Sequence, residues 1–177
     1  MACSLTITGR AFPCKTGVGG IKRVWVSAYA DQDWTAIANG AVTGVTTGQT
    51  LFGFELTKNS GSLQQTVNSS IENGTVFFEQ TLTMVMPLID ASSNDELYEL
   101  MKGRLSVLVQ DANDNLLIMG YNEGVEVSGG DVGTGTAKGD LNGYNLTFVA
   151  HEPLPAPLLA STAGVPTDTN VTLTPGS

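Results

Sequence analysis

The chain has 177 residues, 41% of them hydrophobic, and a net charge of −9, which suits one domain with one core. The charge is uneven: residues 1–60 carry five Lys or Arg and three acidic residues, whereas residues 61–177 carry three and fourteen. A general nucleic-acid binder needs a basic face for phosphates, so this class is excluded. The acidic surface is expected to serve solubility, to repel DNA, or to meet a mildly basic face of an identical subunit.

The first third of the chain predicts short strands and loops. The 21 glycines and the scarcity of Lys and Arg are typical of strands and turns. Polar and apolar residues alternate in residues 1–9 and 21–30, and residues 51–58 form a third expected strand. Residues 31–49 contain one short candidate strand at 34–37 and are otherwise a glycine- and threonine-rich loop.

A long β-hairpin is the strongest local prediction. Residues 63–71 and 75–86 alternate on either side of Asn73-Gly74, and this pair favours a two-residue type I′ turn. Strands of about ten residues reach roughly 33 Å at roughly 3.3 Å per residue, which is long for a domain of this size. We therefore expect neighbouring subunits to complete the sheet.

One helix is expected after the hairpin. Ser93 and Glu96 fit a capping box at its start, and Gly103 supplies a stop. Its apolar residues share one face and are expected to pack on the sheet of the same subunit: Leu97, Leu100 and Met101.

Further strands follow the helix. They are expected at residues 104–110, 116–121, 125–127 and 145–150, with a tight turn at 111–115 and a flexible glycine-rich segment at 129–135. From residue 153 the chain becomes rich in Pro and Thr. The sequence thus predicts one domain over residues 1–152 and an extended C-terminal arm over residues 153–177.

The sequence predicts no active site, metal site or cofactor. His151 is the one histidine, and no Gly-x-Ser-x-Gly motif accompanies it. Cys3 and Cys14 do not form a zinc pattern with His151; two free thiols are expected, with a disulfide as the alternative. Asp111, Asn113 and Asn115 resemble an EF-hand start, but Leu116 and Asn122 replace the required glycine and glutamate.

Targeting signals are also absent from the sequence pattern. No secretion signal is expected at the start, and no run of 18 apolar residues predicts a membrane span. The glycine runs at 17–22 and 133–139 lack the Gly-Lys-Ser/Thr ending of a phosphate-binding loop, so both are expected to be turns.

Several segments resemble structural proteins of tailed phages, especially phages of Bacteroidetes-type hosts. They are residues 1–3, 9–15, 17–22, 72–80 and 139–147, together with the helix, and the resemblance covers roughly residues 1–155. The order of strands, long hairpin, helix and strands is similar to the phage tail tube family. The C-terminal arm is longer than a minimal tube subunit needs, and residues 31–49 are unusually rich in glycine.

This resemblance implies a mainly β fold: a β-sandwich or partial barrel with a long β-hairpin and one flanking α-helix. It implies hexameric rings that stack into a hollow tube, with neighbouring hairpins completing an inner barrel through which DNA passes without specific binding. Other implied partners are a sheath or terminator, a baseplate or tail tip, and a tape measure protein. The implied location is the virion tail, after synthesis in the host cytoplasm. The expected carboxylates of the lumen are Glu72 and Glu79.

Two alternatives remain, one among other virion proteins and one in a different class. A head–tail connector, tail terminator or capsid decoration protein would also use a small β-rich subunit. A carbohydrate-binding β-sandwich of a tail fibre would need exposed aromatic residues, for which Trp25 and Trp34 are the two tryptophans available. An enzyme is the least expected class, because no nucleophile and base are paired.

Overall fold

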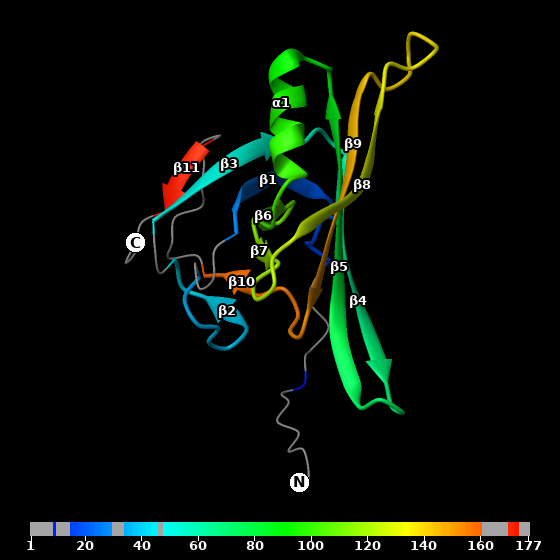
Figure 1. The fold of residues 1–177 in the computed structure, drawn as a ribbon. Coiled ribbons are helices and arrows are strands. Elements are labelled where there is room, and N and C mark those ends of the chain that lie inside the picture. The colour runs from blue at the N-terminus through cyan, green and yellow to red at the C-terminus, as the bar shows by residue number, and fades with distance from the viewer. Residues whose placement is uncertain (1–8, 10–14, 30–33, 46–47, 161–169, 174–177) are drawn as a thin grey trace.

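The computed structural model describes residues 9, 15–29, 34–45, 48–160 and 170–173. Within these ranges the fold is a β-sandwich of two sheets with one flanking helix (Figure 1), which confirms the predicted mainly β class. Of the strand expected at residues 1–9, all but residue 9 lies outside the described residues, as do the thiols of Cys3 and Cys14.

The larger sheet has seven strands in the order β11-β3-β1-β6-β7-β10-β2. Its central strands β1, β6 and β7 are antiparallel neighbours. The bounds are β1 Ile21–Ala28, β2 Ala41–Val42, β3 Gln49–Glu55, β6 Leu105–Asp111, β7 Leu116–Met119, β10 Leu158–Leu159 and β11 Asn170–Leu173.

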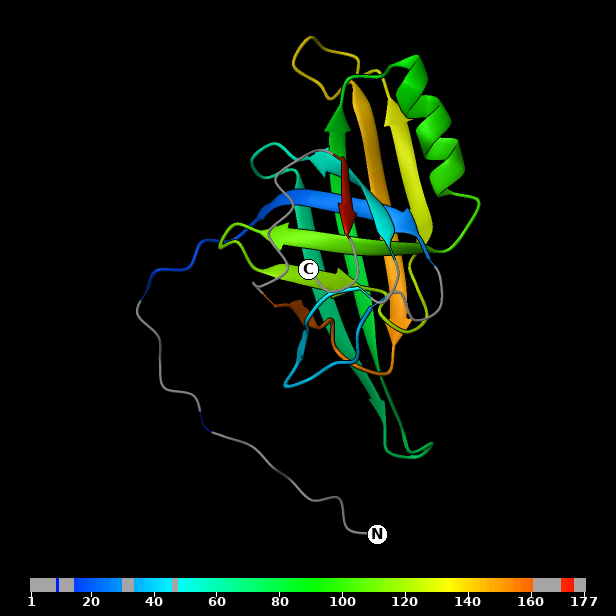
Figure 2. The same ribbon diagram turned by 90° about the vertical axis from the view of Figure 1, so that its left-hand side faces the viewer.

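The smaller sheet has four antiparallel strands in the order β4-β5-β9-β8. In Figure 2 its strands run across those of the larger sheet, as in orthogonal sandwiches. The bounds are β4 Gly61–Ser70, β5 Thr75–Pro87, β8 Glu126–Gly133 and β9 Gly143–Glu152. β8 runs through the segment 129–135 that was expected to be flexible, so that prediction is wrong for residues 129–133.

The predicted hairpin is present, but its turn differs from the prediction. Ser70 pairs with Thr75, so the loop holds four residues, 71–74, and not two. Gly74 has a φ of 63°, whereas Asn73 is not left-handed. A type I′ turn needs positive φ at both central residues, while four-residue loops are most often built around a type I turn.

Apolar residues form one core on each face of the larger sheet. The core between the sheets contains Val24 and Val107 from the larger sheet and Leu82, Met84 and Phe148 from the smaller, all fully buried. The second core lies on the opposite face and contains Trp25, Leu108 and Ile118, with Trp34, Val42 and Leu159 around them. Residues 34–37, expected as a strand, contribute a single bridge between Trp34 and Val45.

Helix α1, Ala91–Leu100, flanks the core between the sheets. Its N-cap is Asp90, not Ser93: the Asp90 carboxylate accepts the Ser93 amide at 2.6 Å. Leu97 and Leu100 pack against the core as half-buried side chains. Met101 was expected beside them but is 55% exposed, because it caps the end of the helix and lies beyond its last packed turn.

Part of the expected C-terminal arm belongs to the larger sheet. β10 lies between β7 and β2, and Leu159 is buried in the second core. β11 pairs with β3 along four residues. The described parts of this segment therefore pack on their own subunit and do not extend freely from it.

Candidate functional site: the outer face of the smaller sheet

The smaller sheet has one face that no described element covers. In Figures 1 and 2, helix α1 and the larger sheet lie on the same side of it. Alternation along β5 sends Leu82 and Met84 into the core, so their neighbours Thr81 and Thr83 point to the opposite side. The side opposite the core is called the outer face below.

The outer face is polar and carries no Lys or Arg. Cross-strand partners share a face, and Thr81 and Thr83 pair with Val149 and Thr147 of β9. The sequences of β4, β5, β8 and β9 contain no basic side chain other than His151. The polar side chains that alternation and register assign to this face are Ser62, Gln64, Thr66, Asn68, Ser70, Thr75, Glu79, Thr81, Thr83, Glu126, Asp131, Asn145, Thr147 and His151, and the same register places Phe77, Val85 and Val149 among them.

Two of the carboxylates on this face are held by neighbouring amides. Asn68 donates to Glu79 at 3.3 Å, and Asn145 donates to Asp131 at 3.1 Å. No Lys or Arg lies on these four strands to offset the carboxylates of Glu79, Glu126 and Asp131.

The two residues expected to line a lumen occupy different places. Glu79 lies on the outer face opposite Thr66 and His151. Glu72 lies in the hairpin loop, exposed and beyond the end of the sheet. Sequence reasoning missed Glu126 and Asp131, which join this face through the pairing of β8 with β9.

Both edges of the smaller sheet are free within the described residues. β4 is an edge strand of ten residues and contains neither a charged residue nor a proline. Monomeric proteins usually protect long edge strands with lysine, proline, bulges or covering loops. β8 forms the other edge and has a register shift between Val127 and Gly129.

Two buried polar side chains attach this sheet to the connection between β7 and β8. Glu152, 1% exposed, accepts the amides of Asn122 and Glu123. Gln80, equally buried, accepts the amide of Gly120 at 3.2 Å. These hydrogen bonds fix the sheet relative to the rest of the subunit, and no local pattern in the sequence predicts the burial of either residue.

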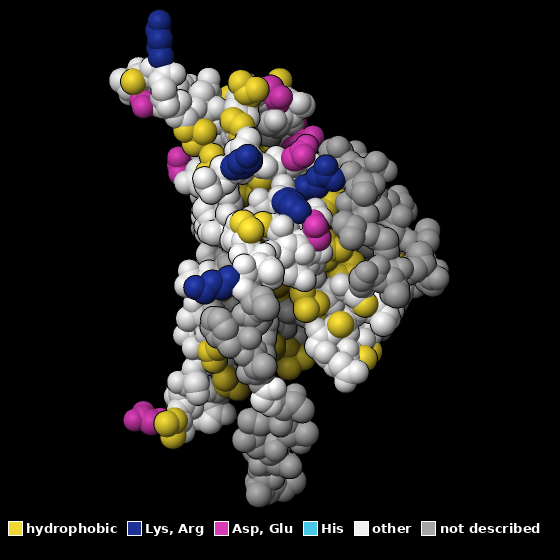
Figure 3. Space-filling model, turned by 180° about the vertical axis from the view of Figure 1, so that it is seen from behind, with side chains coloured by type: hydrophobic (Ala, Val, Ile, Leu, Met, Phe, Trp, Pro, Cys, Tyr) yellow, Lys and Arg dark blue, Asp and Glu magenta, His cyan; other side chains and the backbone are white. Residues whose placement is uncertain are grey.

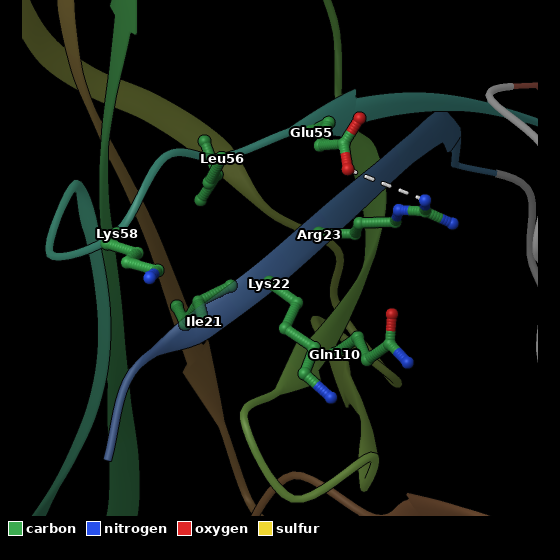
Figure 4. Close-up of a pocket in the computed structure, with 7 residues that line it drawn as sticks. All are labelled: Ile21, Lys22, Arg23, Glu55, Leu56, Lys58 and Gln110. Carbon is green, nitrogen blue, oxygen red and sulfur yellow. Dashed lines mark ion pairs between the residues drawn. The ribbon is translucent and has the colours of Figure 1, made fainter. Parts of the chain in front are cut away.

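A second candidate is a hollow of about 300 Å³ near the start of β1. Figure 4 shows Lys22, Arg23 and Lys58 around it. On the face seen in Figure 3, basic and acidic side chains are interspersed. Lys22 pairs with Asp114 at 2.6 Å and Arg23 with Glu55 at 3.5 Å. The local acids neutralise much of the positive charge, so the hollow does not form a strong anion site.

The other candidate residues from the sequence, Asp111 and His151, make contacts within the fold. Asp111 accepts the amides of Asn113 and Asn115, which closes the turn between β6 and β7. Burial raises the pKa of Asp111, but the hydrogen bonds from Asn115 and Asn113 outweigh burial and leave it below the ordinary value of 3.8. His151 is exposed, and the centroid of its ring lies 5.8 Å from the centroid of the Phe77 ring.

The described ranges lack both a metal-ligand group and a membrane-spanning helix. No group of three His, Cys, Asp or Glu residues there is arranged to hold a metal ion. Likewise, no helix in those ranges has the length and apolar character needed to cross a membrane. Comparison with protein-family models and with curated protein sequences gives no match.

Proposed function

We propose that this chain is the repeating subunit of a phage tail tube, in which the outer face forms the wall of a DNA channel. The observation that carries the proposal is the free edge of β4: ten uncharged residues beside a polar face that has no Lys or Arg. An edge of this kind is a template for pairing with another chain.

The strand directions suit pairing between identical copies. Successive strands in the order β4-β5-β9-β8 are antiparallel, so β8 and β4 run in opposite directions. When β8 of one copy lies beside β4 of the next, the sheet continues as an antiparallel ladder with the same face outward. Such a head-to-tail contact closes into a ring when the rotation between copies permits it.

The charge of the outer face favours the passage of DNA over its retention. DNA carries one negative charge per roughly 1.7 Å of helix axis, and cationic walls hold it through counterion release. A wall of hydroxyl, amide and carboxylate groups offers no such binding. DNA would therefore pass such a wall without specific contacts, as the proposed function requires.

Electron microscopy of the purified protein tests the proposal, with hollow filaments or stacked rings as the expected result. A double variant, Gln64→Lys with Thr66→Lys, places two charges on the β4 edge and should leave folded monomers. Its matched control exchanges the two residues, Gln64→Thr with Thr66→Gln, and should assemble. Normal tubes from the lysine variant, with an unchanged unfolding midpoint, would contradict pairing at β4.

The same images separate the alternatives. Single rings that never stack favour a connector, terminator or decoration protein. The carbohydrate-binding alternative loses support from the tryptophans: Trp25 is fully buried, and Trp34 is 6% exposed and donates to Ser106 at 3.0 Å. Neither ring is available as a platform for a sugar.

A further inference from the structure

The chain contains three Asn-Gly pairs: Asn39-Gly40, Asn73-Gly74 and Asn142-Gly143. In such a pair the glycine backbone nitrogen can attack the side-chain carbonyl carbon of the asparagine, because glycine has no side chain to hinder the approach. The attack requires the backbone to rotate between the two residues. The structure places the three pairs in different surroundings, so their freedom to rotate differs.

Hydrogen bonds hold the first pair in a tight turn. Ala38 and Ala41 exchange both of their backbone hydrogen bonds across it, at 2.8 and 3.1 Å. Asn39 and Gly40 have φ values of 55° and 78°, both positive as a type I′ turn requires. The Gly40 carbonyl also accepts the Leu158 amide at 3.1 Å. Rotation within this pair would therefore break hydrogen bonds.

The third pair is packed against β5. Gly143 begins β9, is buried, and lies opposite Pro87. Even a Cβ atom at Gly143 would collide with the Met86 carbonyl oxygen. The Asn142 carbonyl accepts the Leu88 amide at 2.7 Å. This pair has neither the space nor the free backbone groups that rotation needs.

The second pair lies at the free end of the β4–β5 hairpin. The ladder ends with the pairing of Ser70 and Thr75, so residues 71–74, called the hairpin tip below, lie beyond it. The pairing of β5 with β9 does not reach this end of β5. Asn73 and Gly74 are exposed, and a Cβ atom at Gly74 would meet no atom within 4 Å. The surroundings therefore leave this pair room to rotate.

We propose that Asn73 is a site of spontaneous deamidation, and that the fold protects Asn39 and Asn142 from the same reaction. The Gly74 nitrogen bonds to Cγ of Asn73, the bond from Cγ to the side-chain nitrogen breaks, and that nitrogen leaves as ammonia with the proton of the Gly74 amide. Water then adds across either carbonyl–nitrogen bond of the cyclic succinimide. The ring opens, the glycine N–H is restored, and residue 73 becomes aspartate or isoaspartate.

Both products change the hairpin tip. Each places a new carboxylate beside Glu72, on a hairpin whose strands and loop contain no Lys or Arg. Isoaspartate also routes the main chain through the former side chain, which lengthens the loop between β4 and β5. Because loop length and turn geometry fix the register of a hairpin, the change acts first on the last pair of the ladder, Ser70 with Thr75.

Peptide mapping by mass spectrometry measures all three sites in one sample of the full chain. The protein is incubated at mildly alkaline pH, both folded and in concentrated urea. In the folded protein we expect Asn73 to react at least about tenfold faster than Asn39 or Asn142, because those two pairs react only after local opening. In urea the three rates should converge, because every pair is then unfolded.

Three results would overturn the proposal. They are equal rates at the three sites in the folded protein, faster reaction at Asn39 or Asn142 than at Asn73, and a rate difference that persists in urea. The last result would mean that the neighbouring sequence, and not the fold, sets the rates.

Asn73→Gln is the matched variant, because the longer glutamine side chain closes the corresponding ring much more slowly. It should remove the acidic species that ion-exchange chromatography separates from the aged wild type, while the rates at Asn39 and Asn142 stay unchanged. The same acidic species in aged Asn73→Gln protein would place the new charge elsewhere and overturn the assignment to Asn73.

Discussion

The carboxylate of Glu152 accepts the backbone amide of Asn122 at 3.0 and 3.1 Å through its two oxygens. Glu152 ends β9 in the smaller sheet, whereas Asn122 lies in the connection that leaves β7 of the larger sheet. A buried carboxylate at the end of a strand in one layer thus holds the connection that follows a strand of the other layer. The same carboxylate accepts the Glu123 amide at 2.8 Å.

Removal of this acceptor should destabilise the subunit. Glu152→Ala leaves two backbone amides without their partner, and we expect a loss of about 1–3 kcal/mol in the free energy of unfolding. Glu152→Gln keeps one acceptor oxygen and should lose less. Urea unfolding measures both variants. Equal stability of the Ala and Gln variants would show that the amides find another partner, and Glu123→Ala is the control for an exposed carboxylate.

The helix should contribute to stability through two side chains and not three. Leu100 is half-buried against the core, so Leu100→Ala should lose about 1–2 kcal/mol, less than the 2–5 kcal/mol of fully buried leucines. Met101→Ala should change the free energy of unfolding by less than about 0.5 kcal/mol. A larger effect at Met101 in assembled protein than in monomer would indicate that it contacts a neighbour.

Asp111 should make stability depend on pH in the acid range. Its pKa is lowered in the folded state, so its contribution is complete above the unfolded value and is lost as pH falls through the folded value. We expect Asp111→Asn to be less stable than wild type at pH 7, with the difference shrinking below about pH 4. Urea unfolding at pH 7, 4 and 2 measures this. Asn115→Ala should also reduce the acid dependence, and a difference constant with pH would contradict the assignment.

Glu79 should affect DNA passage without affecting assembly. Glu79→Lys places a cation on the outer face, which should retain DNA by counterion release, most strongly at low salt. The measurement is DNA delivery by particles that carry the variant, together with DNA retention by assembled tubes at two salt concentrations. Glu72→Lys is the comparison, because Glu72 lies at the hairpin tip. Undiminished delivery by Glu79→Lys would place the channel wall elsewhere.

Alternation predicted the face of each β5 residue because a strand repeats every two residues. The sequence placed Thr81 opposite Leu82 correctly, and Leu82 is fully buried. Polar–apolar alternation cannot identify the two faces of a strand when both faces are buried. β6 is buried at every position from Leu105 to Gln110, so its sequence contains no contrast from which two separate cores could be inferred.

Strand β8 and the cap of the helix depend on tertiary contacts, which the sequence pattern does not reveal. β8 contains Gly129 and Gly130, which weaken a strand prediction. A side chain at Gly130 would come within 2.7 Å of the Asn145 carbonyl oxygen, so glycine permits the close approach of β9. Asp and Ser are both favoured N-cap residues, so residue type alone does not distinguish the observed cap Asp90 from the predicted cap Ser93.

A single strand, β5, connects the most and least enclosed parts of the subunit. Its residues Leu82 and Met84 are fully buried between paired strands, whereas Val76 is 55% exposed on a two-stranded ribbon. Amide hydrogen exchange should therefore vary strongly along this strand, with slow exchange near Leu82 and fast exchange near Val76. The outer half of the hairpin should accordingly open to solvent without exposing the core that the inner half covers.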